Sequence, residues 1–127
     1  MSTDSYIPGT CNIGKGEIRR RQLVALIGLA LSVTSLVGFV ATNAAPSARL
    51  GIFLPLAVFA IGFVQSRRKF CLAYGFMGTF NFGKLGQLSK VSSKEAQAAD
   101  RKTALVILGQ SLGSAALLTA VVYILPL

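Results

Sequence analysis

The chain contains three long stretches without a charged residue, and each is rich in apolar side chains. They cover residues 22–48, 50–66 and 103–127, which are 27, 17 and 25 residues long. Helices of about 20 apolar residues cross the bilayer core, because each residue adds about 1.5 Å toward a thickness of about 30 Å. The pattern therefore predicts an all-α integral membrane protein with three transmembrane helices and excludes a water-soluble globular domain.

We interpret residues 1–127 as one membrane domain with five parts. These parts are an N-terminal arm (1–21), a first transmembrane helix (22–42), a second one (48–66), a loop (67–92) and a long helix (93–125) that contains the third. Pro46 suits the first turn of the second helix, whereas Pro55 is expected to bend it. Ser92 and Glu95 fit a capping box, so the long helix should begin in water near Ser93.

Residues 70–83, FCLAYGFMGTFNFG, form an uncharged segment of 14 residues that is too short to cross the membrane. It holds five of the 11 aromatic residues and is interrupted by Gly75 and Gly78. Because aromatic rings favour the headgroup region, we predict an interfacial aromatic and glycine-rich segment between helices 2 and 3. A functional re-entrant loop is the alternative. The second helix can also extend through residues 67–69 into this segment.

Basic residues are concentrated on one side of the predicted membrane. The chain has 13 Lys and Arg against 4 Asp and Glu, a net charge of +9. Of the 13, 12 lie before residue 22 or between residues 67 and 102, and only Arg49 lies between the first two spans. Basic loops stay in the cytoplasm, so the arm and the loop are predicted to be cytoplasmic and the C-terminus outside. A cleaved signal peptide over residues 1–45 is disfavoured, because its lead and apolar core would be too long.

The basic side also indicates what it binds. Over half of the chain is assigned to lipid, and no nucleic-acid-binding pattern is present. We therefore predict anionic lipid headgroups as partners and exclude nucleic acid. The residues predicted to bind lipids or other anions are Arg19, Arg20, Arg21, Arg67, Arg68 and Lys69.

Small residues recur at helical spacing in two of the spans. They are Gly109, Gly113, Ala116 and Ala120 in the third span, and Gly28 and Ser32 in the first. Lipid tails are as apolar as leucine, so membrane helices associate through the close packing that small residues allow. We predict that these faces pack the three helices of one chain together, with contact between chains as the alternative.

The chain lacks the groups that most catalytic sites use. It has no histidine, and its acidic residues are Asp4, Glu17, Glu95 and Asp100. All four lie outside the spans, near helix starts or in extensions where solvated charges are expected. Because no span holds an ionisable residue, a proton pump or proton-coupled transporter is disfavoured. We predict a protein that is not an enzyme and has no metal site, and the sequence assigns no cofactor.

Cys11 and Cys71 are the remaining candidates for chemistry. The predicted topology places both at the cytoplasmic face, and each is surrounded by small and basic residues. Nearby cations favour the thiolate form of cysteine, whereas two thiols alone do not complete a zinc or iron–sulfur site. Three interpretations stay open: a thiol site, an acylation site, or two small apolar residues at the membrane boundary.

The segments YIPGTCNIGKGEIRRR and FVQSRRKFCLAYGFMGTFNFGKLGQ, followed by ADRKTAL, resemble those of a family of small uncharacterised bacterial membrane proteins. The resemblance spans nearly the whole chain but implies no activity and no site residues. We expect the bacterial cytoplasmic (inner) membrane as the location. A looser similarity, an arginine-flanked cysteine in an aromatic and glycine-rich setting, is to the thiosulfate permeases, which are much larger and have many more helices.

Two functional hypotheses follow. The first is a small accessory or scaffold subunit of a larger membrane protein assembly, which fits the size, the lack of catalytic groups and the small-residue faces. The alternative is an oligomeric thiol-dependent carrier or sensor for a sulfur species, an anion or redox equivalents, in which Cys11 and Cys71 act beside the basic residues. Both hypotheses imply other membrane subunits or further copies of the chain as partners.

Overall fold

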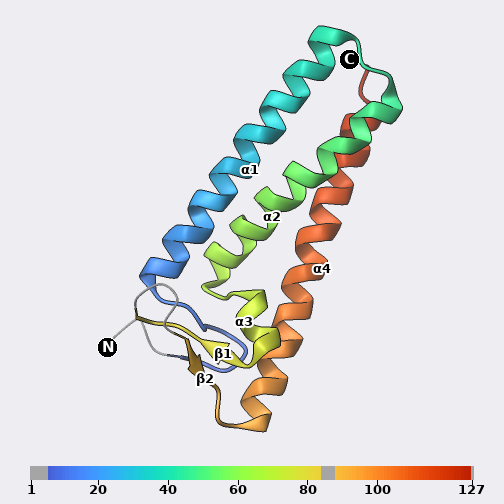
Figure 1. Cartoon of the computed structure of the whole chain (residues 1–127). Helices are drawn as coiled ribbons and strands as arrows, with labels where there is room; N and C mark the ends of the chain where they lie inside the picture. The colour runs from blue at the N-terminus through green and yellow to red at the C-terminus, as the bar shows by residue number, and fades with distance from the viewer. Residues whose placement is uncertain (1–5, 84–87, 127) are drawn as a thin grey trace.

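The computed structural model describes residues 6–83 and 88–126. The first five residues of the predicted arm, residues 84–87 of the predicted loop, and residue 127 lie outside the described part. The elements are α1 (Lys15–Thr42), the 3₁₀ helix η1 (Pro46–Ile52), α2 (Phe53–Arg68), α3 (Leu72–Met77), the strands β1 (Thr79–Phe80) and β2 (Ser89–Lys90), and α4 (Lys94–Ile124) (Figure 1). The chain is mostly helical, and the short antiparallel pair β1–β2 is an addition to the predicted all-α fold.

Among the described residues, three helical segments are long and apolar enough to cross a membrane. They are α1, the run of η1 and α2 from Pro46 to Arg68, and α4. The segments run in alternating directions, so that η1 and the end of α4 lie at one end of the molecule and the starts of α1 and α4 at the other (Figure 1). Helix α2 lies between α1 and α4 and packs against both.

Close contact between α1 and α2 depends on two glycines. A Cβ atom built on Gly28 would lie 2.4 Å from the Phe59 nitrogen, and one on Gly62 would lie 2.7 Å from the Ala25 nitrogen. Ser32 is also buried here, and its hydroxyl donates to the Gly28 carbonyl oxygen at 2.7 Å. Gly28 and Ser32, which the sequence analysis predicted as helix-packing residues, thus lie in a contact between helices of one chain.

The small-residue stripe of the third span faces away from the other helices. Gly109, Gly113, Ala116 and Ala120 are exposed, and a Cβ atom on either glycine would meet no atom of the described residues within 4 Å. The buried face of α4 consists of Ala96, Asp100, Ala104, Ile107, Ser111, Ala115 and Thr119. The prediction that the stripe packs within the chain is therefore wrong. Contacts at Asp100, described below, fix the rotation of α4, and contact between chains stays a prediction.

Three local predictions about helix ends also need correction. Lys69 has a left-handed backbone with φ 56°, so α2 stops at Arg68 and does not extend into the following segment. Pro55 falls in the first turn of α2, where a missing N–H costs little. The cap of α4 is Ser93 and not Ser92, because the Ser93 hydroxyl accepts from the Ala96 nitrogen at 3.3 Å.

Arg49 closes the end of the molecule opposite to the start of α1. Its side chain is buried, and Nη1 donates to the carbonyl oxygens of Val122, Tyr123 and Leu125 at 3.3, 3.3 and 2.7 Å. A cation suits this place, because the last carbonyl groups of a helix carry a partial negative charge. Arg49 thus ties η1 to the end of α4.

Replacing Gly28 by Ala tests the close contact between α1 and α2. We expect Gly28→Ala to lower the free energy of unfolding by about 1–3 kcal/mol, the usual cost of overpacking. Gly38→Ala is the matched control in the same helix, because a Cβ atom there meets no described atom within 4 Å, and it should stabilise the helix by up to about 1 kcal/mol. Denaturant titration of both variants in detergent measures the difference, and equal stabilities would contradict the close contact.

Candidate functional site

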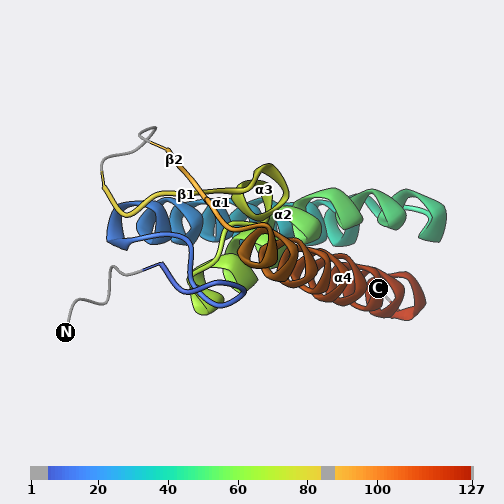
Figure 2. The same ribbon diagram turned by 90° about the horizontal axis from the view of Figure 1, so that it is seen from below.

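Two segments far apart in the sequence fold together where α1 and α4 begin. The first is residues 6–14, and the second is the described part of the segment between α2 and α4, residues 69–83 and 88–93. We call them together the polar cap, and Figure 2 shows it crossing the ends of the long helices. Its two parts pair through their backbones, since the Gly14 nitrogen donates to the Asn81 carbonyl at 2.9 Å and the Asn81 nitrogen donates to the Asn12 carbonyl at 3.0 Å. The polar cap is therefore a folded unit and not a loose loop.

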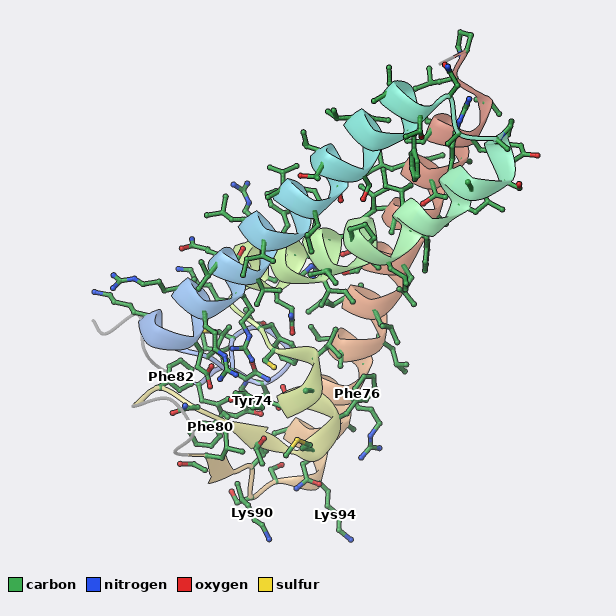
Figure 3. All side chains as sticks on the ribbon, turned by 45° about the horizontal axis from the view of Figure 1, so that its top comes forward. Tyr74, Phe76, Phe80, Phe82, Lys90 and Lys94 are labelled. Atoms are coloured by element: carbon green, nitrogen blue, oxygen red, sulfur yellow. The ribbon has the colours of Figure 1, made fainter. Side chains whose placement is uncertain are left out.

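The aromatic rings of the polar cap lie on more than one side of it. The ring of Tyr6 stacks on that of Phe80 with centroids 4.7 Å apart, and Phe82 lies 6.0 Å from Phe80. Figure 3 shows Tyr74, Phe80 and Phe82 on the side of the cap toward the start of α1, and Phe76 on the side of α4. The aromatic residues that the sequence singled out thus do not share one face.

Asn12 clamps the backbone of Cys71. Asn12 is fully buried, its Oδ1 accepts from the Cys71 nitrogen at 2.7 Å, and its Nδ2 donates to the Cys71 carbonyl at 3.1 Å. The Asn12 nitrogen also donates to the Lys69 carbonyl at 3.2 Å. The segments that carry Cys11 and Cys71 are therefore neighbours, and the side chain that joins them belongs to Asn12.

Glu17 lies at the centre of a buried polar network. It is 1% exposed, and its Oε1 accepts from Arg21 Nη1 at 2.6 Å. Its Oε2 accepts from the Tyr74 hydroxyl and from Asn81 Nδ2, the latter at 3.1 Å. The expectation that this carboxylate is solvated is wrong, because it lies under the polar cap. Burial is tolerated since both oxygens have donors and one donor is a cation.

Tyr74 is a donor in this network. Burial and the hydrogen bond to the Glu17 carboxylate raise the pKa of the Tyr74 phenol above its ordinary value. The phenol therefore stays protonated at neutral pH and continues to donate to Glu17.

The Arg21 guanidinium joins this network to the thiol of Cys71. Arg21 Nη2 donates to Cys71 Sγ at 2.9 Å, and the guanidinium carbon lies 5.4 Å from the centre of the Tyr74 ring. A cation beside sulfur stabilises the negative charge of a thiolate, which is the nucleophilic form of cysteine. Cys11 has a different environment, because its Sγ contacts the Ile13 carbonyl oxygen at 3.7 Å.

A pocket of about 430 Å³ opens beside Cys71. It lies between the start of α1, the end of α2 and α3, and its lining is Arg20, Arg21, Val24, Ile61, Gln65, Cys71, Leu72, Ala73 and Tyr74. Gln65 supports the wall on the α3 side, because its Oε1 accepts from the Leu72 nitrogen at 2.9 Å. Cys11 does not belong to this lining, so the structure places only one of the two candidate cysteines at the pocket.

The six basic residues predicted to bind anions have different roles. Arg20 and Arg21 line the pocket, whereas the lining does not include the exposed Arg19. Arg68 Nη2 donates to Gln110 Oε1 at 3.0 Å and so links α2 to α4. The exposed side chains of Arg67 and Lys69 complete the group at the end of α2.

Asp100 anchors the arm to α4, a role that the sequence analysis missed. It is fully buried, its Oδ2 accepts from the Tyr6 hydroxyl at 2.5 Å, and its Oδ1 accepts from the Gly9 nitrogen at 2.6 Å. The Thr103 hydroxyl donates to the Gly9 carbonyl at 2.6 Å. Burial and the bond to Asp100 raise the pKa of Tyr6, so its phenol also stays protonated. The expectation of a solvated carboxylate at Asp100 is therefore wrong.

The described residues include no group of three or more Cys, Asp and Glu side chains that could hold a metal ion. No family model, no curated protein and no solved structure matches the chain. The functional assignment therefore depends on the geometry of the site, and the resemblance to a family of small bacterial membrane proteins stays a prediction.

Removing the Asn12 side chain tests how the polar cap holds Cys71. We expect Asn12→Ala to destabilise the protein by about 1–3 kcal/mol, because it leaves the buried N–H and C=O groups of Cys71 unpaired. Thr10→Ala, at an exposed position of the same arm, should change stability by less than about 0.5 kcal/mol. Chemical denaturation measures both, and limited proteolysis of residues 6–14 should accelerate in Asn12→Ala alone. Equal stability of the two variants would show that Asn12 is not a clamp.

Proposed function

We propose that this chain is a protein of the bacterial cytoplasmic membrane with the polar cap on the cytoplasmic side. Of the 13 basic residues, 12 lie before residue 22 or between residues 67 and 102, and only Arg49 lies between the first two of the three apolar helices. Positively charged segments are retained in the cytoplasm, so this distribution supports the orientation. Anionic headgroups are the expected neighbours of the exposed arginines at the ends of α1 and α2. Aromatic residues of the polar cap then lie at the membrane interface, as the sequence predicts.

Its function, we propose, is that of a thiol-dependent carrier or sensor for a sulfur species or another small anion, with Cys71 as the reactive group. The observation that carries this proposal is the 2.9 Å contact between Arg21 Nη2 and Cys71 Sγ at the wall of a pocket. The exposed Arg20 supplies positive charge for an anion, and Arg21, which is paired with Glu17, donates from Nη2 to the attacking sulfur. Cys11 then has a structural place in the arm and does not share the reaction.

Methanethiosulfonate reagents of opposite charge test this function. The Cys71 thiolate attacks the sulfenyl sulfur, a new S–S bond forms, the S–S bond of the reagent breaks, and methanesulfinate leaves. We expect Cys11→Ser protein, which keeps Cys71, to react about tenfold faster with the anionic sulfonatoethyl reagent than with the cationic trimethylammonioethyl reagent, because clefts of one charge raise association rates by about tenfold or more. Intact-mass spectrometry follows the rates.

Two controls make this test specific. The Cys71→Ser variant, which keeps Cys11, should react slowly with both reagents, because both cysteines are buried and only Cys71 lines the pocket through which a reagent reaches the sulfur. A single cysteine at the exposed Ser92 in a cysteine-free background corrects for the intrinsic rates of the two reagents. Slow reaction of Cys71 with both reagents, or a faster reaction with the cation, would contradict the proposed function.

A second function, an accessory subunit of a larger assembly, is favoured by the stripe of Gly109, Gly113, Ala116 and Ala120. This stripe is exposed on α4, and close approach of another helix is what such a stripe allows. The two functions are compatible, because the stripe and the Cys71 pocket lie on different elements. Purification of the chain in mild detergent as a monomer without a bound partner would contradict this second function.

A further inference from the structure

The wall of the Cys71 pocket has a polar part and an aliphatic part. Arg20, Arg21 and Tyr74 supply polar groups, whereas Val24, Ile61, Leu72 and Ala73 supply aliphatic surface. Val24 and Ile61 belong to α1 and α2, two of the candidate membrane-spanning segments, so the aliphatic wall continues into the apolar faces of these helices. A small anion beside Arg20 does not cover this surface, which is therefore available to a second class of ligand.

We infer that the pocket binds a single-chain anionic amphiphile, namely a long-chain fatty acid that enters from the bilayer. This inference goes beyond the proposed function, with which it shares the pocket. The carboxylate of the fatty acid pairs with the exposed guanidinium group of Arg20, and its alkyl chain covers Val24 and Ile61. Charge-assisted hydrogen bonds to arginine favour a carboxylate head, and burial of the chain supplies the hydrophobic contribution.

The size of the pocket selects one chain over two. Its volume is about 430 Å³, near the lower end of the range of about 300–1,000 Å³ for small-molecule sites. A carboxylate head with the adjoining part of one alkyl chain suits this volume, whereas a glycerol phosphate with the adjoining parts of two chains needs more room.

Binding of cis-parinaric acid to the full chain in phosphatidylcholine nanodiscs tests the inference. We expect saturable fluorescence with one site per chain, and about tenfold weaker binding of the methyl ester, which lacks the charged head. Arg20→Gln should weaken binding of the acid by about threefold or more, because Arg20 is exposed and its charge is partly screened. Arg19→Gln is the matched control, since the pocket lining does not include Arg19, and its affinity should equal that of the wild type.

A second pair of variants tests the aliphatic wall without disturbing the buried network. Val24 and Val33 are both exposed on α1, and only Val24 lines the pocket. Val24→Trp should abolish saturable binding by filling the pocket, whereas Val33→Trp should bind as the wild type does. Equal binding of the acid and its ester, or full binding by Val24→Trp, would overturn the inference, because both results indicate simple partition into the bilayer.

Two further comparisons show which of the proposals is wrong if the results differ from those expected. Displacement of the probe by a few phosphatidylglycerol molecules per nanodisc would overturn the assignment of a single-chain ligand in favour of a two-chain lipid. Saturable binding without charge-selective thiol reactivity would remove only the proposed function, and charge-selective reactivity without saturable binding would remove only the fatty-acid inference.

Discussion

The buried ion pair of Glu17 and Arg21 is the constraint on which the polar cap depends. Two charged groups at the start of a helix are stable away from water only when their remaining donors and acceptors are satisfied. Arg21 Nη1 contacts Glu17 Oε1 at 2.6 Å, which leaves Glu17 Oε2 and Arg21 Nη2 to be paired by other groups. The polar cap provides these partners, because Tyr74 and Asn81 donate to the carboxylate and Cys71 Sγ accepts from the guanidinium.

This requirement connects the local geometry to the arrangement of the helices. Helix α2 ends at Arg68, and the next residue, Lys69, has a left-handed backbone. Because the helix stops there, the following segment with Cys71 and Tyr74 reaches the ion pair. Asn12 then fixes Cys71 through its backbone, and Asp100 holds the arm of Asn12 against α4. The same buried polar groups that fold the polar cap therefore place one thiol beside one guanidinium at the wall of a pocket. The proposed chemistry uses groups whose positions the fold already needs.

The sequence predicted the long helices well, and the polar cap much less so. Hydropathy reports burial in lipid, which is sufficient for the three spans, and Gly28 and Ser32 were identified by their spacing. Glu17 and Asp100 were expected in water because charged residues near helix starts usually are solvated. A signal was nevertheless present: Glu17, Arg21, Ala25, Gly28 and Ser32 lie on one helical face, and Asp100 shares the face of Ala96 and Ala104. Contacts between distant segments, such as Asn12 with Cys71, leave no such periodic pattern.

A double-mutant cycle of Glu17→Gln and Cys71→Ser measures most directly whether Arg21 joins these residues in one network. Their side chains share Arg21 as a partner, so we expect the two changes in unfolding free energy to differ from additivity by about 0.5–3 kcal/mol. Denaturation of the wild type, both single variants and the double variant in the same detergent gives this coupling energy. Additivity within about 0.3 kcal/mol, the behaviour of independent sites, would contradict the network.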